Sequence, residues 1–242
     1  MQILMITIII AIIAIILILV SPFIGFKPKR VLLSFDTEHV DSEESINSVL
    51  EVLKENDVKA TFFIMTNMTS KKINVIEKIH DKGHELACHT HNHPDMKKIT
   101  KEEKEKELDL CIKIIQDISG INPTGFRAPY HEIDSETFEV LKEKDFKYDA
   151  SLIKGHLNLF VRESIPEIKV TATFGLPIED YFYLYVVNMP NLYTFLQKHK
   201  KGKTLSLLYH PRFIGANPEI LDEVIKYHKN NGAEFLMHEE II

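Results

Sequence analysis

Residues 31–64 read VLLSFDTEHVDSEESINSVLEVLKENDVKATFFI, and this stretch decides the predicted fold. The apolar run Val31–Phe35 predicts a buried strand, and Glu44–Glu55 carries apolar side chains at helical spacing. The run Ala60–Ile64 predicts a second buried strand. A strand, a helix and a strand of these lengths form a βαβ unit, in which the two strands lie parallel.

The same alternation continues along the chain. Further strands are predicted at Glu85–Cys88, Thr124–Phe126, Lys147–Asp149 and Thr204–Tyr209, and further helices at Lys71–Asp81, Lys101–Ile118, Ser135–Glu143, Leu192–Lys198 and Pro218–Asn230. About seven such units favour an α/β fold, a distorted (β/α) barrel of about seven parallel strands, because a closed sheet exposes no strand edge. The segment Ile165–Pro190 breaks the alternation, and we expect it to border the site.

The composition is that of an ordinary globular protein. Hydrophobic residues make up 45% and charged residues 26% of the 242 residues, which excludes disordered and collagen-like chains. The 29 basic and 35 acidic side chains give a net charge of −6, which argues against nucleic acid as a partner. The two cysteines, Cys88 and Cys111, could form at most one disulfide.

The N-terminus differs in composition from the rest of the chain. Residues Ile3–Phe26 contain no charged side chain, and this length suffices to cross a membrane as a helix. The basic n-region and the small-residue cleavage site of a secretory signal are missing. We therefore expect one transmembrane anchor at residues 1–26, followed by one catalytic domain at residues 27–242. A buried Ile-rich strand pair and an atypical cleaved signal are the alternatives.

The side of the membrane on which the catalytic domain lies stays open. Lys27, Lys29 and Arg30 follow the predicted span, and the positive-inside rule then places the domain in the cytoplasm. Envelope glycans lie outside the cell, whereas lipid-linked sugar precursors are also modified at the cytoplasmic face. The predicted localisation is therefore a single-pass membrane protein of undecided orientation.

Titratable side chains follow the predicted strands at the points where the strands end. The carboxyl ends of parallel strands meet at one face of a barrel, where the loops build the site. Five strands therefore deliver reactive groups to one rim, namely Asp36 and Glu38, His89 with His91 and His93, Arg127, Asp149, and His210.

Two of these histidines have the spacing of metal ligands. His89 and His93, with a carboxylate from another strand, form a candidate site for one divalent ion. Imidazole and carboxylate ligands suit Zn²⁺, with Co²⁺, Ni²⁺ and Fe²⁺ as alternatives, and three protein ligands leave a position open for water. His91 lies between them and is a candidate for a supporting or substrate contact. Cys88 is expected to point to the opposite side as a small buried side chain.

Six short motifs occur in an order that is typical of one enzyme family. They are SFDTE at Ser34–Glu38, KATFF at Lys59–Phe63, GHE at Gly83–Glu85, HTHNH at His89–His93, RAPY at Arg127–Tyr130 and LYHP at Leu208–Pro211. With these motifs the chain resembles the polysaccharide deacetylases, carbohydrate esterase family 4, whose shared unit is the NodB-homology domain. The resemblance implies a distorted barrel that carries one metal ion, and an enzyme that removes N- or O-acetyl groups from sugars in a polymer. Removal of an N-acetyl group hydrolyses a carbon–nitrogen bond that is not a peptide bond.

The resemblance also implies a role for each candidate residue. Asp36 is expected to be the general base, Arg127 the residue that orients it, and His210 the general acid. Asp149 resembles an aspartate that tunes this histidine. Tyr130 is expected to hold the oxyanion through its main-chain N–H.

The resemblance assigns the metal to His89, His93 and a carboxylate. The commonest family motif has two adjacent aspartates, the second of which binds metal, whereas Thr37 stands at that position here. We therefore expect Glu38, one residue later, to be the third ligand.

The expected substrate is an acetylated glycan of the cell envelope or a glycolipid precursor. A small-molecule metal amidohydrolase of the same superfamily, similar to allantoinases, is one alternative. A non-catalytic glycan-binding protein with a decayed site is another.

Overall fold

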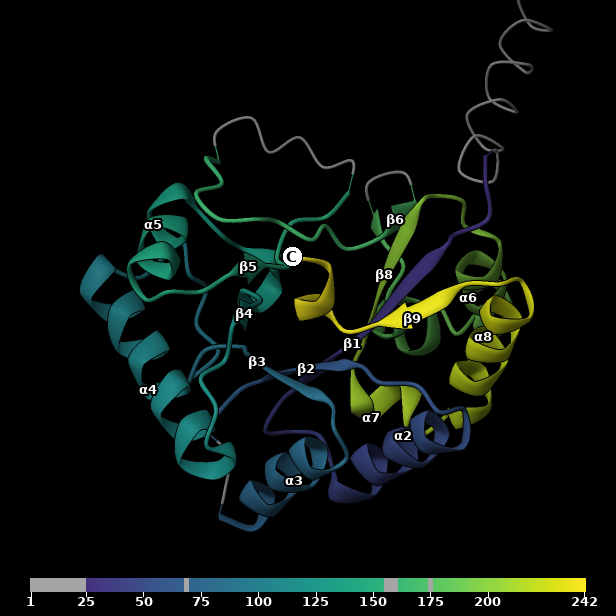
Figure 1. The fold of residues 1–242 in the computed structure, drawn as a ribbon, viewed down its shortest axis with the longest axis horizontal. Helices are drawn as coiled ribbons and strands as arrows, with labels where there is room; N and C mark the ends of the chain where they lie inside the picture. The colour runs from purple at the N-terminus through teal and green to yellow at the C-terminus, as the bar shows by residue number, and fades with distance from the viewer. Residues whose placement is uncertain (1–24, 68–69, 155–160, 174–175) are drawn as a thin grey trace, which may run out of the picture.

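The computed structural model describes residues 25–67, 70–154, 161–173 and 176–242 (Figure 1). Within these ranges no helix combines the length and the apolar character needed to span a bilayer. This finding corrects the predicted single-pass membrane localisation. The anchor expected at residues 1–26 falls almost wholly on residues 1–24, which lie outside the described residues.

A parallel sheet forms the centre of the molecule. Its strands are ordered β5-β4-β3-β2-β1-β8. The strand β9 pairs with the first half of β1, and β2 pairs with the second half of β1. The central strand β1 is buried from Val31 to Thr37. The bounds are β1 Arg30–Thr37, β2 Thr61–Ile64, β3 Glu85–Cys88, β4 Gly125–Phe126, β5 Tyr148–Asp149, β8 Thr204–Tyr209 and β9 Glu234–Leu236.

The sheet has the expected seven parallel strands, but it is a half-barrel, which corrects the expected closure of the distorted barrel. Between β5 and β8 the described residues provide only isolated bridges, Asp149 to Glu167, Ile153 to Val170, and Glu179 to Leu208. Three prolines in the crossing segment, at positions 166, 177 and 190, lack the N–H that a sheet ladder requires. A short antiparallel pair, β6 (Ala172–Thr173) and β7 (Leu176–Pro177), lies in the same segment.

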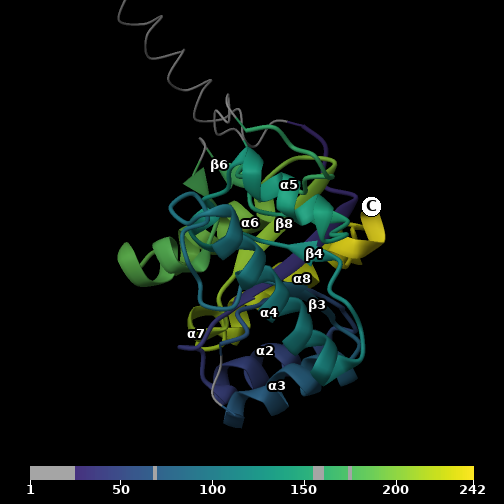
Figure 2. The ribbon, with the colours of Figure 1, turned by 90° about the vertical axis from the view of Figure 1, so that its left-hand side faces the viewer.

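Helices lie along three sides of this sheet, at the left, the bottom and the right of Figure 1. Figure 2 shows α4 and α5 lying across the strands β3 and β4 on one side. A capping box of Thr100 and Glu103 begins α4, and Gly120 in the left-handed conformation ends it. The helices are α2 Glu43–Glu55, α3 Ser70–Asp81, α4 Lys101–Ser119, α5 Ser135–Glu143, α6 Pro190–His199, α7 Pro211–Ile214 and α8 Pro218–Asn230, with shorter turns η2 Pro129–His131, η3 Tyr181–Val186 and η4 His238–Ile241.

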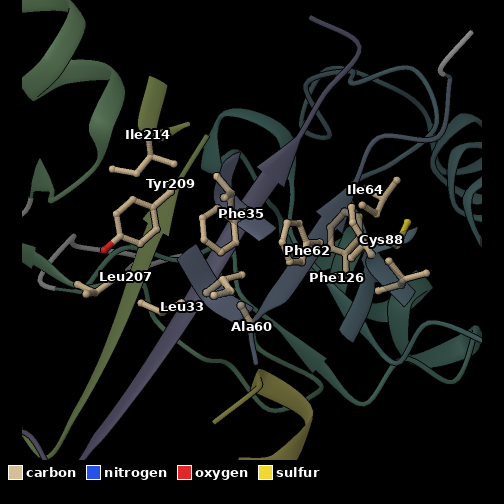
Figure 3. Close-up of a cluster of buried hydrophobic side chains, with 14 of the residues drawn as sticks. Leu33, Phe35, Ala60, Phe62, Ile64, Cys88, Phe126, Leu207, Tyr209 and Ile214 are labelled. Atoms are coloured by element: carbon tan, nitrogen blue, oxygen red, sulfur yellow. The ribbon is translucent and has the colours of Figure 1, made fainter. Parts of the chain in front are cut away.

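Aromatic rings from three neighbouring strands pack in the core between sheet and helices (Figure 3). The ring centroid of Phe35 lies 4.8 Å from that of Phe62 and 5.4 Å from that of Tyr209. Cys88 is fully buried, as expected, and forms a disulfide with Cys111, which joins β3 to α4. The residues that follow β1, β3 and β8, which are Glu38, His89 and His210, are therefore attached to strands that are packed in the core.

The turn η4 covers the opposite end of the sheet. The buried His238 bonds to the hydroxyl groups of Thr61 on β2 and Ser206 on β8. The N–H of Glu239 donates to Glu85 on β3. The amino ends of three strands are thus tied together below the core, and the carboxyl ends are left to form the site.

Candidate active site

A cavity of about 540 Å³ lies at the carboxyl ends of the strands. It is lined by Asp36, Glu38, His39, His89, His93, Ala128, Tyr130, His131, Glu179, Tyr181, His210 and Arg212. A larger hollow of about 680 Å³ beside Gly25 is lined by lysines, glycines and one phenylalanine, and it borders the residues that are not described. Only the smaller of these two cavities brings carboxylates and imidazoles together, so it is the candidate site.

Asp36 is held by a buried arginine. Arg127 Nη1 lies 2.6 Å from Asp36 Oδ1 and 3.0 Å from Ser34 Oγ. Its Nε donates to the carbonyl of Ala150, and its guanidinium lies 4.0 Å from the ring centroid of Phe63. Burial acts to raise the pKa of Asp36, but the charge of Arg127, together with the nearby imidazoles of His89, His210 and His131, outweighs it and holds this pKa well below its usual value. Asp36 is therefore an anion that can accept a proton.

His210 is paired with Asp180. Its Nδ1 lies 2.8 Å from Asp180 Oδ1, and its main-chain N–H donates to Asp180 Oδ2 at 2.7 Å. Burial alone would lower the pKa of His210, but the Asp180 carboxylate raises it to about 9. The imidazole is thus protonated at neutral pH, and its Nε2–H can donate a proton because Nδ1 is bonded to Asp180.

Asp149 does not have the position expected for it. Its two oxygens accept hydrogen bonds from Ser151 Oγ at 2.7 Å and Ser151 N at 2.8 Å. Burial, together with the neighbouring Asp149 charge, raises the pKa of Glu167 to about 12, so Glu167 is neutral beside it. The carboxylate that contacts His210 is Asp180, which lies in the segment that the sequence left unassigned.

Glu38, His89 and His93 can hold a metal ion. One donor atom from each lies within 4.8 Å of the others. His89 Nδ1 donates to the carbonyl of Arg127 at 2.8 Å, which leaves Nε2 as its free donor atom. Glu38 Oε1 lies 3.5 Å from His93 Nε2, and Glu38 Oε2 lies 3.0 Å from Arg212 Nη1. Two imidazoles and a carboxylate oriented in this way fit a divalent ion such as Zn²⁺.

A turn after β3 brings the two histidines together. Thr90 and His93 both have a positive φ, and the N–H of His93 donates to Thr90 Oγ1. The ring centroids of His89 and His93 are consequently only 4.9 Å apart. From α4, Glu107 accepts hydrogen bonds from the N–H groups of His91 and Asn92, which fastens the turn to the helix. The His91 side chain contacts Thr66 and does not line the cavity.

Tyr130 lies at the rim. It has a φ of 58° and is 64% exposed, and its ring lies 4.7 Å from that of His93. The next residue, His131, donates from Nδ1 to the carbonyl of Ser151, and burial lowers its pKa to about 4. Left-handed residues of this kind are costly and concentrate at functional sites.

The sequence model of the family described as "Polysaccharide deacetylase" matches residues 24–148, which is just over half of the chain. The chain belongs to the polysaccharide deacetylase family. The family predicted from the short motifs is thereby confirmed.

Named relatives of this polysaccharide deacetylase family member include a peptidoglycan-N-acetylglucosamine deacetylase of Bacillus cereus. It is 29% identical over 121 residues, which are 50% of this chain and 43% of that protein. The chain spans less than half the length of several curated relatives that it matches.

Solved structures share the fold of the family member described here. A peptidoglycan N-acetylglucosamine deacetylase superposes with a TM-score of 0.68 at 20% identity, covering 90% of each chain. A pseudoenzyme of carbohydrate esterase family 4 from Bacillus anthracis superposes with a TM-score of 0.69 at 20% identity, covering 88% of this chain and 65% of that one. These likenesses establish the parallel α/β half-barrel.

The structure brings most of the predicted residues to one place. Asp36, Glu38, His89, His93, Tyr130 and His210 line the cavity, and Arg127 lies directly behind Asp36. Sequence reasoning missed Asp180 and Arg212. Arg212 follows the LYHP motif by one residue and could have been noticed there, whereas Asp180 lies in the irregular segment and carries no such signal. The roles given to these residues stay predictions.

Proposed function

We propose that this protein hydrolyses acetyl groups from the N-acetylated, or O-acetylated, sugars of a glycan with the help of one divalent ion. The observation that carries the proposal is the presence, in one cavity, of an ionised carboxylate, a protonated imidazole and a group of metal-binding donors. Hydrolysis of an amide requires a proton acceptor for water, stabilisation of the oxyanion and a proton donor for the leaving nitrogen.

Asp36 would accept the proton of the attacking water. Arg127 keeps this carboxylate ionised and, through its bonds to Ser34 and Ala150, keeps it in place. A divalent ion held by Glu38, His89 and His93 would supply Lewis-acid polarisation of the acetyl group and of the water. The main-chain N–H of Tyr130 would donate to the oxyanion.

His210 would complete the reaction as the proton donor. Its pairing with Asp180 fixes Nδ1 as the bonded nitrogen, so that the proton on Nε2 is the one available to the leaving amine. The deprotonated imidazole would remain hydrogen-bonded to Asp180 until it is protonated again.

Metal analysis and acetate release on the same preparation test the proposal. The purified protein, supplied with Zn²⁺, should hold one equivalent by elemental mass spectrometry and release acetate from N-acetylglucosamine oligomers until a chelator is added. Asp36→Asn should lower kcat by about 10²–10⁴-fold and keep the metal, because the amide retains the shape but accepts no proton. Asp81→Asn, a change at an exposed aspartate of α3, is the matched control. Metal binding and sugar binding without acetate release would refute the proposal and favour a glycan-binding protein.

A further inference from the structure

Three aromatic rings form a continuous surface beside His210. They belong to Tyr181 and Tyr185 of the π-helix η3 and to Phe213 of α7. The Tyr181 centroid lies 5.8 Å from that of Tyr185 and 5.5 Å from that of Phe213, and the Tyr185 and Phe213 centroids are also 5.5 Å apart. We call these three rings the aromatic platform.

The two tyrosine rings of the platform are open to solvent, the Phe213 ring is half-buried, and the platform reaches the cavity through Tyr181. Tyr181 lines the cavity and is 43% exposed, whereas Tyr185 is 69% exposed. The Phe213 ring lies 5.9 Å from the ring of His210. An apolar surface of this kind, which leads directly out of a polar site, is typical of ligand recognition.

One carboxylate fixes the platform relative to the proton donor. Asp180 is fully buried and caps η3 by accepting the N–H of Tyr181 at 2.9 Å, and the same side chain accepts both hydrogen bonds from His210. Arg212, which contacts Glu38, lies over the Phe213 ring at 4.7 Å from its centroid. The platform therefore has a defined position relative to His210 through Asp180, and relative to Glu38 through Arg212. π-Helical turns are rare and occur frequently at functional sites.

We infer that the aromatic platform binds a pyranose ring of the polymer, adjacent to the sugar whose acetyl group enters the cavity. This inference rests on the proposed function. A pyranose has an apolar face of C–H groups and a rim of hydroxyl groups, so it fits an aromatic ring whose own hydroxyl lies at the edge, as in tyrosine. The neighbouring sugar of the polymer would thus be held outside the cavity. The protein would therefore have a higher kcat/KM for polymers than for single sugars.

Acetate release from N-acetylglucosamine oligomers of two to six sugars tests the platform. For the wild-type protein kcat/KM should rise with oligomer length. Tyr185→Ala should lower kcat/KM on the hexamer about tenfold, mainly through KM, and should affect the dimer much less. Tyr185→Phe keeps the ring and should recover most of the loss. Val186→Ala removes an exposed apolar side chain from the same turn without touching the platform, and it is the matched control.

Failure of the platform can be distinguished from failure of the proposed function. Equal losses on dimer and hexamer, or no loss, in a protein that releases acetate would overturn the platform and leave the deacetylase intact. Titration calorimetry of the same oligomers with Asp36→Asn measures binding without turnover. Tyr185-dependent binding that increases with length supports the platform even where no acetate is released, whereas length-independent binding there overturns it.

Discussion

Asp180 satisfies three donors with one carboxylate, two from His210 and one from Tyr181. It has no exposed surface, so its charge acts on His210 with little screening by solvent. The pKa of His210 therefore lies at about 9, above its ordinary value of 6.5. A pKa raised by folding stabilises the folded state fully below pH 6.5, and this contribution is lost as the pH rises through about 9.

Replacement of Asp180 tests this pairing through the pH profile. A proton donor with a pKa of about 9 should sustain kcat/KM up to that pH and lose it above, so the wild-type profile should fall on the alkaline side near pH 9. Asp180→Asn removes the charge, and the alkaline limb should move toward pH 6.5. The measurement is kcat/KM for acetate release between pH 5 and 10.

Asp149→Asn provides the comparison for the same profile. Asp149 was the aspartate that the sequence assigned to His210, yet it bonds to Ser151. Its replacement should leave the alkaline limb in place. A limb that moves in Asp149→Asn and stays in Asp180→Asn would contradict the structure.

At the residue scale the sequence predicted the side chains that follow strands, because a strand end fixes where the next side chain lies. His89, Arg127 and His210 directly follow β3, β4 and β8, and Asp36 is the last residue but one of β1. The partner of His210 could not be predicted, because Asp180 reaches it from a segment 30 residues away whose π-helix shows no recognisable period in the sequence.

At the scale of elements, α4 supports the histidine turn. Glu107 accepts the N–H of His91 at 2.9 Å and that of Asn92 at 2.6 Å. The turn contains residues with positive φ, so these bonds help to hold a conformation that is intrinsically unfavourable. The metal donors are therefore positioned in part by a helix that does not itself reach the cavity.

Glu107→Ala tests the support given by α4. Loss of the two acceptors should loosen the turn and raise the dissociation constant for Zn²⁺ by about tenfold, within the range found for residues that orient metal ligands. Competition with a chromophoric chelator measures this constant. Glu102→Ala, at an exposed position in the first turn of the same helix, is the control. Equal zinc affinity in both variants would show that the turn keeps its conformation without the hydrogen bonds to Glu107.

The elements with strong periodicity were predicted closely. The strand Glu85–Cys88 and the helices Ser135–Glu143 and Pro218–Asn230 have the expected bounds. The strand β9 and the π-helix η3 were missed, because three residues show no period and a π-helix does not follow the spacing of an α-helix.

At the scale of the whole molecule, one end of the sheet forms the candidate site and the other end is closed by η4. The carboxyl ends of the strands carry the reactive groups, and η4 closes the amino ends. Burial lowers the pKa of His238 well below 6.5, so this imidazole is neutral in the folded protein. A histidine pKa lowered by folding costs stability as the pH falls below 6.5, because the unfolded chain then binds the proton.

His238→Ala tests the division of tasks between the two ends. The change leaves a cavity and unpaired hydroxyl groups at Thr61 and Ser206, so the free energy of unfolding should fall by roughly 2–4 kcal/mol. Zinc affinity should be unaltered, since none of Glu38, His89 and His93 is among the groups that act on His238, whereas Asp36 and Arg127 are. Urea unfolding and zinc titration give the two quantities, and His80→Ala on α3 is the control. A large loss of zinc affinity in the folded variant would contradict this separation.

The incomplete barrel has a consequence for how such proteins diversify. Asp36, Glu38, His89, His93 and Arg127 all come from the part of the chain that matches the family model, whereas the rings of Tyr181 and Tyr185 come from the segment that spans the gap in the sheet. On the proposed function, mutations of Tyr181 and Tyr185 would alter glycan recognition and leave Asp36, Glu38, His89, His93 and Arg127 in place. Because Asp180 lies in the same segment as Tyr181 and Tyr185, exchange of this segment in a chimeric protein must keep an aspartate at position 180 to preserve the pairing with His210.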